Sequence, residues 1–327
     1  MTDTKKKGNP FVRFLKFLFP WKGDSAGEVI RKLVFLASVI ALIVCGIYFA
    51  NRFMQRKNYS DTARLANLVE DSDAVKKDGT LEKYTKLSQI NKDFVGWLTV
   101  DGTGVDVPVV QTQDNETYLR KDFYGNYSVY GAPFLDYRNN LNSLFNQKSI
   151  FNVMDRNLTV YGHNMLDNMV FAELLKYKDL DFYKEHPLIH FNTVYGDTTW
   201  KVFAAFLTNS TDDQDNNYCL EYNFVGCDED RFLPYIKELA KRTYINTGVD
   251  VNSKDTLLTL STCDKSVIDE GRFVIVARLV RPNESEKVDV SKAYANDNIK
   301  FPQGYYTKKK LSNPYKDDGR WTPYKKQ

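Results

Sequence analysis

The sequence predicts a mainly β protein, a closed or nearly closed barrel of eight strands that is carried on one membrane-spanning helix near the N-terminus. Eight segments with the residue types of strands follow one another between residues 94 and 281. Aromatic residues, which strands favour, make up 14% of the chain. Residues 33–50 hold no charge and can span a bilayer core of roughly 30 Å.

The composition excludes several other classes of protein. A hydrophobic share of 43% is too high for a disordered chain. The net charge of +3 offers no chain-wide basic field, so we expect no nucleic-acid partner. The four Cys and three His contain no CxxC pair, and we predict neither a metal site nor a cofactor.

The membrane segment predicts where the rest of the chain lies. Residues 1–32 form a basic tail, and the positive-inside rule keeps such a tail in the cytoplasm. Residues 33–50 are the predicted anchor, so that the C-terminal part is extracellular and the protein is single-pass in the cell membrane. A cleaved signal peptide is the alternative, but no small-x-small cleavage pattern follows the apolar run.

The outer part divides into a helical stalk at 51–91, a barrel at 92–282 and a tail at 283–327. The stalk has helical spacing of its apolar residues, which predicts two short helices. Helices are also predicted at 169–177 and at 229–242, the second before strand seven. The tail is basic and lacks periodicity, so we expect it to be flexible. The predicted strands are 94–100, 105–111, 132–137, 158–164, 188–194, 198–208, 255–263 and 271–281.

The segment between strands six and seven is acidic, with no Lys or Arg from residue 209 to residue 230. Asp213, Asp215 and Asn217 have the spacing of calcium ligands, but Tyr218 stands where an EF-hand needs Gly, so we favour a solvated loop. Cys219 and Cys227 could form a disulfide outside the cell or remain two free thiols.

Three residues at strand ends could form a reactive site. Cys263 ends one strand, His163 ends another, and Arg272 begins the strand after Cys263. A cysteine with an ordinary pKa near 8.5 is mostly a thiol at neutral pH, and a nearby imidazole can take its proton. A fixed guanidinium can stabilise the thiolate or a developing oxyanion. Taken singly, each residue has an ordinary structural explanation, and only their meeting at one rim would make a site.

The motifs that carry these residues resemble those of the sortases. TLSTC (259–263) precedes Arg272 in GRFVIVARL, and YGHN (161–164) lies upstream. The resemblance spans roughly residues 91–281 and is to class B in particular. The flanking text that points to class B is VGWLTVDGTGVDVPVVQ (95–111), YLRKDFYG (118–125), APFLDYRN (132–139) and FYKEHPLI (182–189).

The resemblance implies a sortase-type eight-stranded β-barrel and a cysteine transpeptidase. Cys263 would be the nucleophile, His163 the acid and base, and Arg272 the oxyanion or substrate clamp. The substrate would be a surface protein with a C-terminal sorting signal of the Asn-Pro-x-Thr type, cleaved after Thr. The acceptor would be an amine of a peptidoglycan precursor or a pilin Lys. Ser261, Thr262 and Asp264 would help to line the signal groove, with the Asp264 N–H as an oxyanion donor.

Some alternatives stay open at this stage. Arg278 lies on the same strand as Arg272, and its even offset places it on the same face. A secreted cysteine peptidase would use the same thiol with water as the acceptor. A surface binding module without activity would use the groove alone. The sequence does not name the client protein, the acceptor or the oligomeric state.

Overall fold

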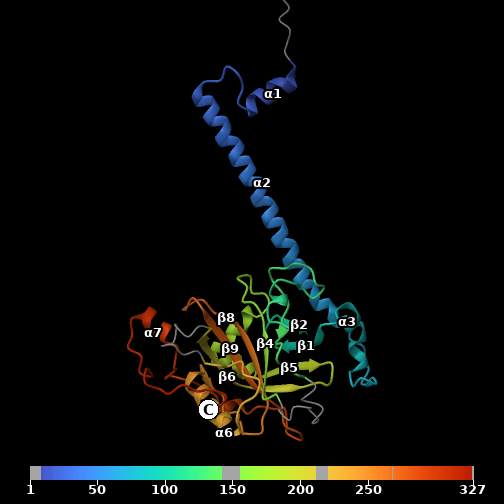
Figure 1. The fold of residues 1–327 in the computed structure, drawn as a ribbon, viewed down its shortest axis with the longest axis vertical. Helices are drawn as coiled ribbons and strands as arrows, with labels where there is room; N and C mark the ends of the chain where they lie inside the picture. The colour runs from blue at the N-terminus through green and yellow to red at the C-terminus, as the bar shows by residue number, and fades with distance from the viewer. Residues whose placement is uncertain (1–8, 142–154, 211–219, 267, 326–327) are drawn as a thin grey trace, which may run out of the picture. The chain divides into compact units, whose positions relative to one another are not determined.

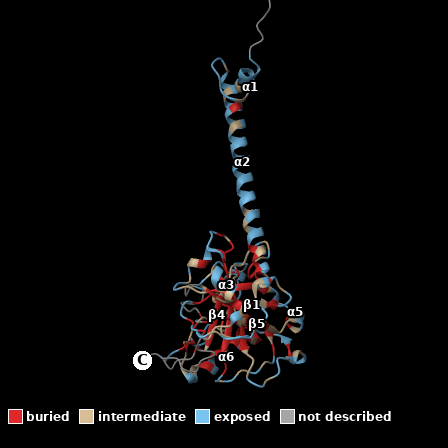
Figure 2. Ribbon diagram, turned by 90° about the vertical axis from the view of Figure 1, so that its right-hand side faces the viewer, coloured by how far each residue is buried: buried red, intermediate tan, exposed pale blue. Residues whose placement is uncertain are grey.

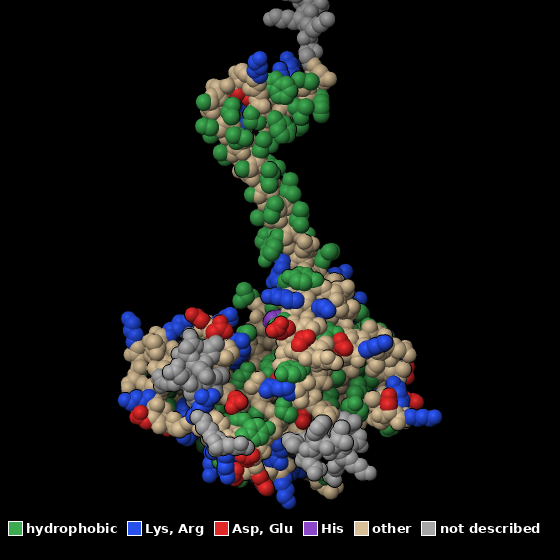
Figure 3. Space-filling view, in the orientation of Figure 1, with side chains coloured by type: hydrophobic (Ala, Val, Ile, Leu, Met, Phe, Trp, Pro, Cys, Tyr) green, Lys and Arg blue, Asp and Glu red, His purple; other side chains and the backbone are tan. Residues whose placement is uncertain are grey.

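The computed structural model describes residues 9–141, 155–210, 220–266 and 268–325, which form two compact units, 1–58 and 59–327. The first unit holds α1 (Pro10–Leu18) and most of α2 (Ala26–Asp61). Hydrophobic side chains cover α2, and the helix is long and apolar enough to cross a membrane (Figure 3). The ammonium of Lys32 donates to the Lys16 carbonyl and to Asp24, both at 2.6 Å, and so ties α1 to the start of α2.

The second unit is built on a closed barrel with the strand order β1-β2-β3-β4-β8-β9-β6-β5 (Figure 1). The eight-stranded barrel of the prediction is therefore confirmed. Two pairs of neighbouring strands are parallel, namely β2 with β3 and β4 with β8. The other pairs of neighbouring strands are antiparallel. The strands are β1 (Phe94–Val100), β2 (Val105–Val110), β3 (Phe134–Leu135), β4 (Asn157–Tyr161), β5 (Leu188–Thr193), β6 (Thr199–Asn209), β8 (Leu257–Cys263) and β9 (Gly271–Leu279).

Two of the three hydrophobic cores among the described residues explain why β6, β8 and β9 are apolar on both faces. Inside the barrel, residues such as Leu98, Leu158 and Trp200 are fully buried. The strands β6, β8 and β9 are apolar on their outer face as well, because α6 (Glu229–Arg242) packs there and forms the second core. This is why the TLSTC strand reads as a continuous apolar run, as strands covered on both faces do. Buried residues accordingly fill the centre of the barrel in Figure 2.

The helices match the predictions in part. The helix predicted at 229–242 is α6, which continues through Pro234. The stalk holds the 3-10 helices η1 (Thr62–Leu68) and η2 (Glu82–Tyr84) and the short helix α3 (Thr85–Ile90). The helix predicted at 169–177 is the 3-10 helix η4 (Ala172–Lys178), and α5 (Leu180–Glu185) follows it unpredicted. Strand β3 is shorter than its predicted range because only two of its residues join the ladder.

The segment after β9 differs from the expected flexible tail, because its described residues pack on the barrel. Strand β10 (Tyr294–Ala295) pairs with β7 (Ile245–Asn246), and helix α7 (Gln303–Lys309) follows. Trp321 is 5% exposed and its ring lies 4.6 Å from that of Tyr235. Single anchors of this kind, spaced far apart, leave no periodic pattern in the sequence.

Two predictions lie outside the described residues. The possible calcium ligands Asp213, Asp215 and Asn217 are among residues 211–219, and so is Cys219, the proposed partner of Cys227. Within the described ranges, no group of three or more His, Cys, Asp or Glu side chains is placed to hold a metal ion.

Candidate active site

Strands β8 and β9 form a hairpin that brings Cys263 and Arg272 together. The two residues are direct partners in the antiparallel ladder. The hairpin is closed by the Asp264 N–H, which donates to the Gly271 carbonyl at 2.9 Å. A Cβ at position 271 would lie 2.1 Å from the Asp264 carbonyl oxygen, so only glycine permits this close approach.

The parallel neighbour of β8 supplies His163. Tyr161 at the end of β4 pairs with Ser261, and the Gly162 N–H donates to the Ser261 carbonyl at 3.1 Å. His163 therefore follows β4 at the same end of the barrel where Cys263 ends β8. The Asn164 side-chain amide also donates to the Cys263 carbonyl at 2.6 Å, which joins the two chain segments directly.

The three predicted residues line one cleft of about 450 Å³. Each is partly exposed, so that a substrate can reach it. A peptide in this cleft would meet a thiol, an imidazole and a guanidinium, a set that can supply the nucleophile, the base and the oxyanion donor of acyl transfer through a thioester. The described residues that line the cleft are Asn115, Leu119, Phe134, Tyr161, Gly162, His163, Ser210, Tyr222, Ser261, Thr262, Cys263 and Arg272.

The orientation of His163 is fixed by a backbone carbonyl. Its Nε2 lies 2.9 Å from the Leu119 oxygen. A carbonyl only accepts, so Nε2 carries the hydrogen, and Nδ1 is the basic nitrogen of the neutral ring. Gly131 has a φ of 62°, and a Cβ there would lie 2.4 Å from the Tyr118 oxygen and 3.3 Å from Cδ2 of His163.

The structure separates the two candidate arginines. Arg272 lies at the cleft, whereas Arg278 pairs with Leu257 at the other end of β8. Arg278 is 1% exposed, and its guanidinium donates to both oxygens of Glu284, at 2.6 and 2.9 Å. Arg278 is thus a buried structural cation, and Arg272 is the candidate for the site.

Ser261 and Thr262 line the cleft as expected, and the Ser261 hydroxyl lies 3.0 Å from that of Tyr222. Asp264 does not belong to the described lining, which corrects its predicted role. Its side chain is buried and accepts from Lys178 at 2.6 Å and from Ser266 at 2.5 Å. Burial acts to raise the pKa of Asp264, but the hydrogen bonds from Lys178 and Ser266 outweigh it and lower the pKa. The Asp264 N–H is already used by the hairpin, so it is not an available oxyanion donor.

The cleft residues that no sequence pattern indicated come mainly from loops. Asn115 and Leu119 lie between β2 and β3, and Tyr222 precedes α6. Two segments of the class B resemblance contain cleft residues of this kind: YLRKDFYG contains Leu119, and APFLDYRN contains Phe134. Their place at the site depends on the closure of the barrel.

A cysteine, a histidine and an arginine at one rim of a closed eight-stranded barrel define a class of protein, the cysteine transpeptidases of the sortase fold. Residues 98–280 match the model of the Sortase domain. The chain belongs to the sortase family. Within it the chain is a sortase B-family cysteine transpeptidase, which removes the alternative of a binding module without activity.

The relatives that support this assignment are covered over most of their own length. Sortase B of Listeria monocytogenes is 30% identical over 75% of this chain and 97% of its own, and Sortase B of Staphylococcus aureus is 29% identical over 76% and 96%. Among solved structures, sortase B from Bacillus anthracis in complex with AAEK1 aligns with a TM-score of 0.57 at 27% identity, over 72% of this chain and all of that one. A Staphylococcus aureus sortase B–substrate complex aligns with a TM-score of 0.55 at 28% identity, over 71% and 99%.

Proposed function

We propose that the chain cleaves a C-terminal sorting signal of the Asn-Pro-x-Thr type after Thr and joins the released protein to an amine. The amine would belong to a cell-wall precursor or to a pilin lysine. The observation that carries the proposal is the shared cleft of His163, Cys263 and Arg272. Further support comes from two sortase B structures, one described as a substrate complex and one as a complex with triglycine.

The first half of the reaction forms a thioester. The Cys263 sulfur, after giving its proton to His163, attacks the Thr carbonyl carbon, and the oxygen becomes an oxyanion. The guanidinium of Arg272 stabilises this negative charge, which is greater in the transition state than in the substrate. The C–N bond then breaks, and the imidazolium returns its proton to the leaving amine.

The second half reverses these roles. The acceptor amine attacks the thioester carbonyl and gives a proton to His163, and the C–S bond breaks. The new amide leaves and the thiol is regenerated. Water would give hydrolysis instead, so an amine that is bound in the cleft decides between a ligase and a peptidase.

We also propose that α2 anchors the enzyme in the cell membrane, with residues 1–32 in the cytoplasm and the barrel outside. The most apolar 18-residue stretch of this helix has a mean hydropathy of 2.7, and none of the residues in that stretch is buried. The charges that precede it are basic, which favours this orientation. The intact mass of the protein extracted from its host membrane tests the anchor, because cleavage after residue 50 would remove the N-terminal tail and overturn it.

The reaction is tested with the full-length protein in detergent micelles. The reagents are an Asn-Pro-x-Thr peptide with residues on both sides of the scissile bond and triglycine as the amine. Mass spectrometry should find the ligated product with the wild type and none with Cys263→Ala. Hydrolysed product alone, at saturating triglycine, would favour the peptidase. A Cys263→Ala protein that still ligates would exclude the proposed nucleophile.

A further inference from the structure

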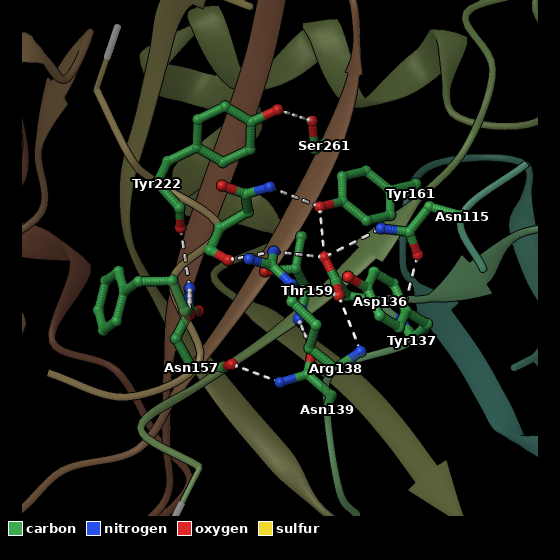
Figure 4. Close-up of polar contacts among 12 residues, drawn as sticks. Asn115, Asp136, Tyr137, Arg138, Asn139, Asn157, Thr159, Tyr161, Tyr222 and Ser261 are labelled. Carbon is green, nitrogen blue, oxygen red and sulfur yellow. Dashed lines mark hydrogen bonds and ion pairs between the residues drawn. The ribbon is translucent and has the colours of Figure 1, made fainter. Parts of the chain in front are cut away.

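A buried carboxylate lies beneath one wall of the cleft. Asp136 follows β3 and is 0% exposed. Arg138 donates to it from Nε at 2.9 Å and from a terminal nitrogen at 2.7 Å, and the Tyr161 hydroxyl donates at 2.8 Å (Figure 4). The Asn115 amide adds a longer bond at 3.2 Å. These donors satisfy a charge that would be costly to bury alone.

Two of these donors are themselves part of the cleft. Asn115 and Tyr161 both line it, one from the loop after β2 and the other from β4. The Asn115 oxygen accepts from the Tyr137 N–H at 3.0 Å, so both ends of its amide are held and its orientation is set. Asp136 therefore helps to hold both side chains in one orientation in the cleft wall.

The same network extends to the loop before α6. Asn223 donates from its side-chain amide to the Tyr161 hydroxyl at 2.9 Å, and its backbone carbonyl accepts from Arg138 at 2.8 Å. The preceding residue, Tyr222, lines the cleft and contacts the Ser261 hydroxyl. The Asn157 side-chain amide donates to the Tyr222 carbonyl at 2.8 Å and so holds the same loop from β4.

We propose that Asp136 is a positioning residue that fixes one wall of the substrate cleft by joining Asn115, Tyr161 and the Asn223 loop into one hydrogen-bonded unit. The inference rests on the proposed function, because it assumes that a peptide binds in this cleft. The carboxylate binds Asn115 and Tyr161 directly and holds the Asn223 loop only through Arg138 and Tyr161, so its loss would free the first two side chains and weaken the attachment of the loop. Peptide binding would then have to order a cleft wall that is already ordered in the wild type, and the affinity for the peptide would fall.

The proposal separates binding from chemistry. The described side-chain hydrogen bonds of the Asp136 carboxylate come from Asn115, Arg138 and Tyr161, and none comes from His163 or Arg272. We therefore expect Asp136 to act on the KM for the peptide, while the reactivity of the thiol stays unchanged.

Asp136→Asn is the test variant, because it keeps the shape and removes the charge. Its matched control is Asp255→Asn. Asp255 is also buried and also binds a guanidinium twice, that of Arg281, at 2.8 Å for both bonds. It precedes β8, about 25 Å of extended chain away from Cys263. Both variants lose a buried carboxylate–arginine pair, but only one of them loses the cleft wall.

We expect Asp136→Asn to raise the peptide KM roughly tenfold with kcat within about twofold of the wild type. The rate of Cys263 alkylation by iodoacetamide, measured across pH, should not change. Asp255→Asn should lower the melting temperature without changing KM. An unchanged KM for Asp136→Asn, or the same KM change in both variants, would overturn the proposal.

A second variant keeps the proposal testable if Asp136→Asn does not fold. Tyr161→Phe removes only the hydroxyl between Asp136 and Asn223, and we expect a severalfold rise in KM. In the double variant the two effects should be less than additive, since both break one network. A Tyr161→Phe enzyme with the wild-type KM would contradict the inference. A wild-type protein that never forms a thioester with the peptide would instead refute the proposed function.

Discussion

Cys263 and Arg272 occupy directly opposed positions of the β8–β9 ladder. Opposed residues of an antiparallel pair place their side chains on the same face, with Cβ atoms about 4.5–5.5 Å apart. The cation therefore reaches the sulfur's neighbourhood through backbone pairing alone, without help from a mobile loop. The hairpin that fixes this pairing also occupies the Asp264 N–H, which leaves the guanidinium as the candidate for charge stabilisation.

Replacing Arg272 by Ala should lower kcat/KM by about 10²–10³, the usual cost of removing one donor to an oxyanion. Arg272→Lys should recover only part of this loss, because an ammonium cannot copy the planar fork. Peptide cleavage rates at subsaturating substrate measure both effects. Arg278→Lys is the control on the same strand, and it should lower the melting temperature with kcat/KM intact. If Arg278→Lys alone impaired catalysis, the assignment of the two arginines would have to be exchanged.

Gly131→Ala should impair catalysis through His163. An alanine Cβ at this position, where φ is 62°, would meet the Tyr118 carbonyl, so the loop that presents the Leu119 oxygen to Nε2 must move. We expect at least a tenfold loss of kcat. The control is Gly125→Ala, at a φ of 81° but with no described atom within 4 Å of the added carbon. It bears the same backbone strain, about 1 kcal/mol, and should lose stability only. Equal kcat values for the two variants would argue against a histidine seated by this loop.

Glu284→Gln should destabilise the fold by about 3 kcal/mol, because it removes the nearest counter-charge of the buried Lys201 and Arg278 and leaves Arg278 only a longer contact, of 3.5 Å, with Asp250. The hydrogen bond from Arg278 holds the pKa of Glu284 well below its usual range despite burial, and Lys201 adds to the effect. A depressed carboxyl pKa gives stability that is present above the unfolded-state pKa, near 4.3, and is lost as the pH falls below it. Denaturant unfolding from pH 7 to pH 3 measures the free energy of unfolding of both proteins. The difference between wild type and variant should become smaller below about pH 4. A gap that stays constant over this range would show that the charge is not the cause.

Trp321→Ala should cost about 3–5 kcal/mol, the usual range for a buried aromatic residue. Its ring packs on Tyr235 and Phe224, and its indole N–H donates to the Arg231 carbonyl at 2.9 Å. Tyr324→Ala, at a side chain that is 54% exposed, is the neighbouring control and should be close to neutral. Thermal unfolding of the two variants decides whether residues after β9 belong to the folded domain. If Trp321→Ala left the stability unchanged, the segment after β9 would not contribute to the folded domain.

The strands around the candidate site could be predicted because they are covered on both faces and read as long apolar runs. The predicted boundaries of β8 and β9 are nearly correct. Together with the YGHN motif, these strands identified His163, Cys263 and Arg272, which the structure places in one cleft. Strand β3 could not be delimited, because a two-residue pairing leaves almost no pattern.

Asp264 shows a different limit. Its neighbour Cys263 turns toward the cleft, and successive side chains of an extended segment point to opposite sides, so Asp264 turns into the protein. Alternation alone could have suggested this. Its partner Lys178, in contrast, comes from η4, and no local sequence pattern predicts that contact.

The parallel pairing of β4 with β8 has a consequence for when the active site can form during synthesis of the chain. The imidazole is synthesised early, whereas the sulfur and the cation that complete the cleft come only after β5, β6 and α6 have been made. Pairings between distant segments form slowly, since a long loop must close first. A nascent chain that has not yet been extended through β8 and β9 therefore carries an imidazole but no thiol or guanidinium beside it.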